Sequence, residues 1–295
     1  MKSIFSLLIF FSFYSGVFAQ DNTDLRQKLT EIISKQDAEI GISLRMIENN
    51  DSLTINGNLN APMMSVFKFH IALAVLDLVD KGKLSLNQKI FVRKTDLHAD
   101  TWSPMRDDYP EGNVYLTLDK ILRYTVSDSD NNGCDILIDL VGGTKAIQDY
   151  IDKIGVKDFT IKVNEQQMST LENCYLNTTT PIAMTDLLVY FYKGKILKKK
   201  STKYLIQLME QNSRGTTWMK GQLPKNTVVA HRTGISNQND AGLRVAHNDV
   251  GIITLPNGKH FVLSIFQKNI KNQTQEISAQ TMSELTKVVW DYYLN

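Results

Sequence analysis

Ser65-Val66-Phe67-Lys68 opens the stretch SVFKFHIALAVLDLVDK, which occupies residues 65–81. Apolar residues recur in it at intervals of three and four, the spacing that predicts a long amphipathic helix; they are Phe69, Ala72, Leu73, Leu76 and Val79. Ser65 and Lys68 stand three residues apart at the start of this helix, so their side chains share one face, one turn apart.

Outward from this helix, the patterns differ between the middle and the two ends of the chain. Helical spacing predicts a terminal helix at 25–36 and further helices at 118–125, 131–141, 144–154, 183–192 and 276–293. Alternating or continuous apolar residues predict strands at 39–47, 228–231, 250–255 and 261–266, the last two joined by an Asn257-Gly258 hairpin turn.

Strands at both ends around a helical middle predict an α/β (α+β) fold. One antiparallel sheet, flanked by helices and formed from residues 20–60 and 208–295, is interrupted by an inserted all-helical domain at 61–207. We expect the active site in the cleft between the two parts, because such junctions often form small-ligand sites.

Composition places the protein among exported globular proteins. The 295 residues are 42% hydrophobic and 22% charged. Residues 1–19 have the charged start, apolar core and small-residue end of a signal peptide, so we expect cleavage near Ala19/Gln20, secretion to the periplasm and no membrane association afterwards. Removal of Lys2 takes the net charge from 33 − 31 = +2 to 32 − 31 = +1. This balance gives no support to nucleic-acid binding, and the basic run 198–200 is interpreted as a solvated loop or helix end.

The two cysteines, Cys134 and Cys174, allow one disulfide in an oxidising compartment, but the sequence does not decide whether they pair. No His or second Cys stands near either at the spacing of metal ligands. We therefore expect neither a metal nor another cofactor.

The Ser65/Lys68 pair has the residue types of an activated nucleophile. A serine hydroxyl needs a nearby base, and a lysine serves when its pKa is lowered. Alone the pair is weak evidence, because roughly one Ser-x-x-Lys is expected by chance in a chain of this length. On this motif alone, an N-cap serine beside a surface lysine is the better explanation.

Three further segments carry polar groups suited to catalysis. Ser129-Asp130-Asn131 lies in a turn between two predicted helices, where it is either a proton relay or a plain N-cap. His231-Arg232-Thr233-Gly234 ends a predicted strand, and its cation, hydroxyl and flexible backbone suit a carboxylate. Glu165 lies in a polar, turn-rich stretch, where a carboxylate is most often a solvated charge.

Together and in this order, these four segments resemble the signature of the class A serine β-lactamases. The resemblance extends from the signal peptide to the C-terminal helix and implies the serine β-lactamase/D,D-peptidase fold. Three stretches look most like the extended-spectrum branch: Thr101-Trp102-Ser103-Pro104, Val126-Ser127-Asp128-Ser129-Asp130-Asn131 and Leu223-Pro224-Lys225-Asn226.

The resemblance implies a role for each matching catalytic residue. Ser65 would be the nucleophile, and Lys68 would share the role of acylation base with Glu165 acting through a water. Glu165 would also activate the water that clears the acyl-enzyme. Ser129 would protonate the leaving lactam nitrogen. The backbone N–H groups of Ser65 and Ile235 would form the oxyanion hole.

The resemblance also implies the substrate contacts and the partner. Asn131 would hold the acyl amide of a β-lactam, Arg232 and Thr233 its carboxylate, and Trp102 would form a wall at the cleft mouth. Gly234 would let the substrate approach the strand. Family members are usually monomers, so we expect a monomer whose partner is a small β-lactam.

Some positions depart from the family pattern. Arg232 replaces the usual lysine, and Ser169 replaces an asparagine that helps Glu165 to hold the deacylating water. Val250 stands where many members have a second carboxylate-binding arginine. Residues 237–248 look like an insertion, in which Arg244 is either a substitute for that arginine or a surface residue.

Two rival functions share the segments described above, apart from that of Glu165. A penicillin-binding D,D-peptidase would keep its acyl-enzyme for peptide chemistry, and a β-lactam sensor domain would acylate once and stop. Glu165 favours the hydrolase, because these peptidases lack a carboxylate poised to activate water.

Overall fold

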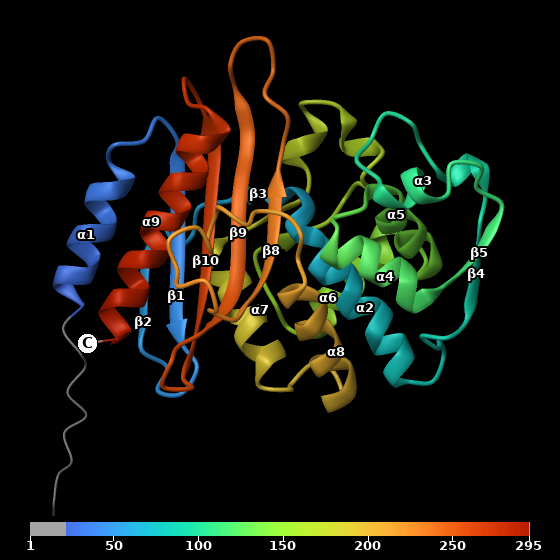
Figure 1. Cartoon of the computed structure of the whole chain (residues 1–295), viewed down its shortest axis with the longest axis horizontal. Helices are drawn as coiled ribbons and strands as arrows, with labels where there is room; N and C mark the ends of the chain where they lie inside the picture. The colour runs from blue at the N-terminus through green and yellow to red at the C-terminus, as the bar shows by residue number, and fades with distance from the viewer. Residues whose placement is uncertain (1–21, 295) are drawn as a thin grey trace, which may run out of the picture.

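The computed structural model describes residues 22–294, and a five-stranded antiparallel sheet stands at their centre (Figure 1). Its order is β2-β1-β10-β9-β8, with β1 at Glu39–Met46, β2 at Ser52–Ile55, β8 at Val229–Ile235, β9 at Arg244–Thr254 and β10 at His260–Ile270. Every pairing is antiparallel. The predicted sheet, built from both ends of the chain, is confirmed.

Two terminal helices cover one face of the sheet (Figure 1). They are α1 (Thr23–Ile33) and α9 (Gln275–Leu294), and they pack against each other. Their apolar residues form one core with the sheet, in which Leu29, Leu285 and Val289 are fully buried. The two chain ends therefore contribute the outer layer, as the helical patterns at 25–36 and 276–293 predict.

The other face of the sheet carries the middle of the chain, which is mainly helical. Its α-helices are α2 (Lys68–Asp80), α3 (Pro104–Asp108), α4 (Leu118–Ser127), α5 (Asn131–Leu140), α6 (Thr144–Lys153), α7 (Pro181–Tyr192) and α8 (Lys199–Glu210). Short 3-10 helices lie at η1 (Met64–Phe67), η2 (Lys94–Asp96), η3 (Gln167–Ser169) and η4 (Asn173–Tyr175). Helix α7 packs on β1 and β10, and α8 packs on β8.

Helix α2 differs from its prediction. The structure buries all residues 68–76 rather than one face of the helix, because α4, α5, α6 and α8 surround it. A helix enclosed on every side holds its side chains in fixed positions. Lys68, at the first position of α2, is therefore held on a rigid support.

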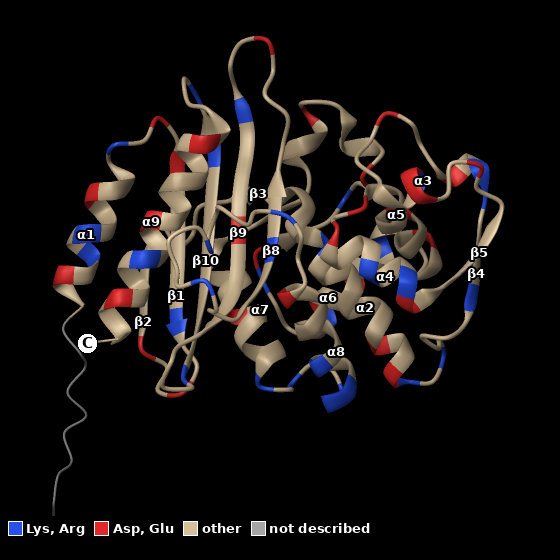
Figure 2. Ribbon diagram, in the orientation of Figure 1, with Lys and Arg blue, Asp and Glu red and all other residues tan. Residues whose placement is uncertain are grey.

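Several elements were not predicted. The middle of the chain contains the hairpin β4 (Lys89–Val92) with β5 (Val114–Thr117), and a small sheet β3-β7-β6 made of Ala61–Pro62, Thr178–Thr179 and Phe159–Thr160. Their strands are two to four residues long, too short for a clear alternation. The run 198–200 leads into α8, where the ribbon in Figure 2 carries the blue of Lys and Arg.

The segment 237–248 is not wholly a loop. Strand β9 begins at Arg244, so the second half of the expected insertion belongs to the sheet. Cys134 and Cys174 are both free and buried. The predicted signal peptide lies outside the described residues. Among residues 22–294, no helix is long and apolar enough to cross a membrane.

Candidate active site

The chain reaches Ser65 through a constrained turn. Eight described residues other than glycine have positive φ, and six of them are Asn or Asp, which tolerate that conformation. The two exceptions are Met64 (φ 47°), directly before Ser65, and Ser129 (φ 62°). Strained backbone of this kind persists where the surrounding structure enforces it. Both exceptions therefore mark the region that the serine motifs predict.

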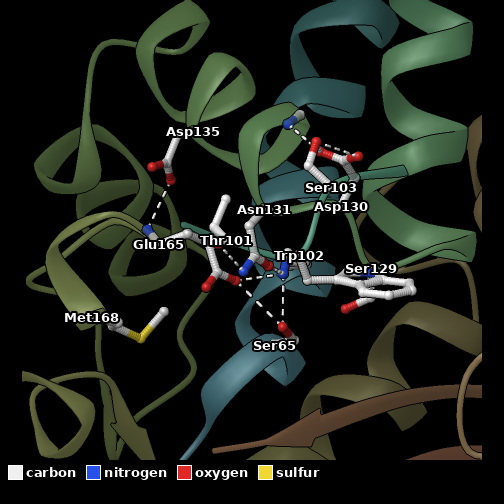
Figure 3. Close-up of polar contacts among 12 residues, drawn as sticks. Ser65, Thr101, Trp102, Ser103, Ser129, Asp130, Asn131, Asp135, Glu165 and Met168 are labelled. Atoms are coloured by element: carbon white, nitrogen blue, oxygen red, sulfur yellow. Dashed lines mark hydrogen bonds and ion pairs between the residues drawn. The ribbon is translucent and has the colours of Figure 1, made fainter. Parts of the chain in front are cut away.

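Lys68 is the centre of the polar network (Figure 3). Its Nζ donates to Ser65 Oγ at 2.7 Å and to Asn131 Oδ1 at 2.6 Å, and it forms an ion pair with Glu165. Ser65 Oγ donates to Glu165 Oε1 at 3.3 Å. The hydroxyl of Ser65 thus contacts an amine and a carboxylate, either of which can accept a proton from it in a suitable protonation state.

Glu165 is held at this network by its own backbone. The carboxylate of Asp135, on α5, accepts from the backbone N–H of Glu165 at 2.8 Å and from that of Gln166 at 3.0 Å. Burial raises the pKa of Asp135 to about 7, and the nearby charge of Glu165 acts in the same direction. Asp135 therefore fixes the backbone position from which the Glu165 side chain extends.

A second anchor closes the loop that carries Glu165, residues 161–177, here named the Glu165 loop. The buried amide of Asn177 donates to Val163 O at 2.8 Å and accepts from the N–H groups of Lys162 and Val163. The carbonyl of Asn177 accepts from Met63 N at 2.9 Å. One residue therefore ties both ends of the Glu165 loop together and joins them to the Ser65 turn.

Ser129 lies on the other side of Ser65 from Glu165 in Figure 3, and Arg232 contacts it. Arg232 Nη2 donates to Ser129 Oγ at 2.7 Å, and the guanidinium is fully buried. Its Nε and Nη1 have no hydrogen-bond partner in the described structure. Burial lowers the pKa of Arg232 to about 10. A buried cation with free N–H groups is a strong site for an anionic ligand.

Gly234 brings strand β8 against the Ser65 turn. A Cβ at Gly234 would lie 2.4 Å from Met63 O and 3.1 Å from Ser65 N. Only glycine permits this approach, so the edge of β8 and the nucleophile are in direct contact. Ile235 follows at the end of the same strand.

Trp102 and Asp130 shape the mouth of the site. Trp102 is 48% exposed and donates from Nε1 to Asp128 O at 2.9 Å. The buried carboxylate of Asp130 accepts from Ser103 Oγ, Met105 N and Gly133 N, which joins the Trp102 loop to the start of α5. Asn131 Nδ2 donates to Thr101 Oγ1 at 2.6 Å. These bonds fix Asn131 and Trp102 on one frame.

Comparison with known proteins identifies this arrangement. A family model described as the β-lactamase enzyme family matches residues 24–293. The β-lactamase VEB-1 of Pseudomonas aeruginosa is 44% identical and covers 98% of this chain and 97% of its own length. The structure of TLA-1 extended-spectrum β-lactamase is 45% identical, covers 92% of this chain and 99% of its own, and superposes with a TM-score of 0.90.

The chain belongs to the class A β-lactamases. The extended-spectrum β-lactamase PER-1 of Pseudomonas aeruginosa is also similar, with 36% identity over 90% of this chain and 86% of its own. A class A β-lactamase from Bacteroides cellulosilyticus superposes with a TM-score of 0.87 at 33% identity, over 91% of this chain and 96% of its own. The reaction of this family is hydrolysis of the β-lactam ring, which confers antibiotic resistance.

Ser169 and Arg244, two residues that the sequence singled out, differ in their burial. Ser169 is exposed on η3, and its hydroxyl makes no hydrogen bond to another described residue. Arg244 is buried rather than a surface residue, and its guanidinium bonds to Ser236 O. Of the surrounding charges, Glu276 at the start of α9 acts on its pKa, which burial lowers. Arg244 is therefore bound to the backbone next to the end of β8.

The β-lactamase also uses residues that no motif singled out. Asp135 and Asn177 position the Glu165 loop, yet each is a single polar residue in an unremarkable stretch of sequence. Helical spacing offered one signal, because Asp135 follows Asn131 by one turn and so shares its face. Among residues 22–294, no group of three His, Cys, Asp or Glu is arranged to hold a metal ion.

Proposed function

We propose that Ser65 is the nucleophile that opens the β-lactam ring and that Glu165 activates the water that releases the product. The observation that carries this proposal is the position of Ser65 Oγ, 2.7 Å from Lys68 Nζ and 3.3 Å from Glu165 Oε1. In acylation, Ser65 Oγ attacks the lactam carbonyl carbon as its proton leaves. The proton moves to Lys68 after Lys68 has passed one to Glu165, or to Glu165 through a water.

Backbone N–H groups stabilise the oxyanion, and Ser129 protonates the leaving group. The backbone N–H groups of Ser65 and Ile235 bind the oxyanion, and one such donor is typically worth about 3 to 4 kcal/mol of barrier. When the C–N bond breaks, Ser129 gives its proton to the nitrogen. Because Ser129 Oγ accepts from Arg232, its own hydrogen is free for this transfer.

Deacylation reuses the carboxylate. Glu165 takes a proton from a water, the resulting hydroxide attacks the ester carbonyl, and Ser65 leaves with a proton returned through the network. The two bonds from Asp135 keep the Glu165 backbone in place during this step. No step needs a metal or another cofactor.

The proposal also assigns the substrate contacts. Arg232 and Thr233 bind the substrate carboxylate, Asn131 its acyl amide, and Trp102 flanks the ring system. Gly234 permits close approach to β8. We further propose that the protein works as a monomer in the periplasm after removal of residues 1–19. Because the relatives PER-1 and TLA-1 are extended-spectrum β-lactamases, we also propose an extended spectrum for this protein.

One experiment tests the proposal. The mature protein is mixed with a chromogenic cephalosporin, ring opening is followed to steady state, and the quenched mixture is weighed by intact mass. We expect many turnovers in the wild type, none in Ser65→Ala, and in Glu165→Gln one burst per enzyme with a stable acyl adduct. Steady turnover by Glu165→Gln, or a stoichiometric burst by the wild type, contradicts the proposal. Addition of EDTA should change nothing.

A further inference from the structure

Arg214 lies over the exposed ring of Trp102. Its guanidinium carbon is 4.3 Å from the ring centroid, which is a cation–π contact. Among residues 22–294, the Arg214 side chain has no hydrogen-bond acceptor and no ion-pair partner. An arginine guanidinium carries five N–H donors, and no described residue accepts from those of Arg214. This half-buried guanidinium is therefore available to a ligand.

The segment that carries Arg214 is fixed between the two residues that flank the candidate carboxylate site. Buried Asn212 accepts from Arg214 N at 3.0 Å and donates to His231 O at 3.3 Å, directly before Arg232. Ser213 donates to Asp128 Oδ1 at 2.9 Å, directly before Ser129. Residues 212–214 thus connect strand β8 to the turn that holds Ser129.

Arg232 offers free donors beside this segment. Its Nε and Nη1 are buried without partners, and its remaining bond goes to Ser129. Burial lowers the pKa of Arg232, and the charge of Arg214 is among the smaller effects in the same direction. Two guanidinium groups close enough to repel each other favour an anion that contacts both.

The position across the strand pair supplies no such cation. Val250 is the β9 residue directly opposite Arg232, and it is fully buried in the apolar core. Arg244 bonds to Ser236 O at the far end of β9. Arg214 differs from Arg244 in two ways. Its guanidinium has no hydrogen-bond partner among the described residues, and its segment is bonded to His231, next to Arg232.

We propose that Arg214 is a second cation for the substrate carboxylate and that it leaves the Trp102 ring to pair with the bound anion. The proposal rests on the proposed function of the site. A cation–π contact at a ring exposed to water is weaker than a charge-assisted hydrogen bond to a carboxylate. Binding of an anionic β-lactam therefore favours the move, and release of the product reverses it.

The test compares two forms of one chromogenic cephalosporin, the free C4 carboxylate and its methyl ester. For Arg214→Gln we expect kcat/KM on the acid to fall by about tenfold, mainly through KM, because one charge-assisted contact is lost. The ester lacks the anion, so its kcat/KM should not change. Arg214→Lys should recover part of the loss. Lys225→Gln, which removes an exposed cation from the loop before β8, is the control for net charge.

The outcomes distinguish a failure of the Arg214 role from a failure of the proposed function. An equal loss on acid and ester, or no loss on the acid, overturns the role of Arg214. A wild type that does not turn over either form, or a Ser65→Ala variant that does, instead contradicts the proposed function. A dependence of the acid's KM on salt that weakens in Arg214→Gln but not in Lys225→Gln would support the proposal.

Discussion

Asp135 accepts a hydrogen bond at 2.8 Å from the backbone N–H of Glu165, thirty residues further along the chain. A second bond, from Gln166 N at 3.0 Å, makes the contact two-pronged. The side chain of Asp135 thus holds the reacting carboxylate in place through the backbone of Glu165 and Gln166. Asp135 is a positioning residue, and its environment gives it a titration of its own.

The stability that Asp135 contributes should fall as pH rises. Its ordinary pKa of 3.8 applies to the unfolded chain, whereas burial raises the pKa to about 7 in the fold. Between these values the folded protein binds more protons, so the free energy of unfolding declines with increasing pH. Asp135→Asn does not titrate. We expect the stability advantage of the wild type over Asp135→Asn to shrink between pH 4 and pH 8, by no more than about 4 kcal/mol.

Urea unfolding at several pH values measures this difference. Asp139→Asn is the matched control, because Asp139 is an exposed carboxylate on the same helix. The pH dependence of Asp139→Asn is the baseline with which that of Asp135→Asn is compared. A pH-independent gap for Asp135→Asn would mean that Asp135 has an ordinary pKa in the folded protein.

Asn177→Ala should loosen the Glu165 loop. The change removes a part-buried bond to Lys162 N and two buried bonds, to Val163 N and Val163 O. Buried groups left unpaired cost stability, so we expect a loss of about 2 to 4 kcal/mol in urea unfolding. Deacylation should slow more than acylation, since Glu165 moves with the loop.

Asn173→Ala provides the comparison within the same loop. Asn173 lies in η4 and is more exposed than Asn177. Its side chain donates to Gln167 O at 2.7 Å. A change there should stay within about 0.5 kcal/mol. Equal effects of the two substitutions would show that the ends of the loop do not depend on Asn177.

Gly234→Ala should damage the nucleophile turn itself. The new Cβ would meet backbone atoms of Met63 and Ser65, which cannot move aside as a flexible side chain does. We expect acylation of the folded protein to slow by about tenfold or more, because oxyanion-hole geometry is displaced. Gly251→Ala is equally crowded, but its closest contacts are with His231 and Ala230. That variant should lose stability while retaining acylation; a normal acylation rate in Gly234→Ala would contradict the argument.

Much of the fold was predictable because long elements have strong patterns. The strands β1 and β10 and the helices α5 and α6 lie within a few residues of their predicted bounds. The β4–β5 hairpin and the β3-β7-β6 sheet were missed because two to four residues carry almost no periodicity. Burial of α2 on every side was also beyond the pattern, since its neighbours come from distant segments.

The site likewise contains residues that motifs predicted and residues that only the structure revealed. Ser65, Lys68, Asn131 and Glu165 meet as the motifs predict, because family motifs preserve residue types at the reacting centre. Ser169 is exposed on η3, and its expected help to Glu165 in holding the water stays a prediction. The support from Asp135 and Asn177 depends on contacts across the Glu165 loop. Such contacts have no local signature.

The cysteines give a last test, which concerns the fold rather than the reaction. Both are free and buried, and burial raises the pKa of each thiol, that of Cys134 most strongly. The thiolate is the reactive form, so both groups should resist a thiol reagent such as Ellman's reagent in the native protein. Unfolding in urea without reductant should expose two thiols per chain. If no thiol is titrated after unfolding, a disulfide is present and the Glu165 loop must be linked to α5 by a covalent bond that the structure does not contain.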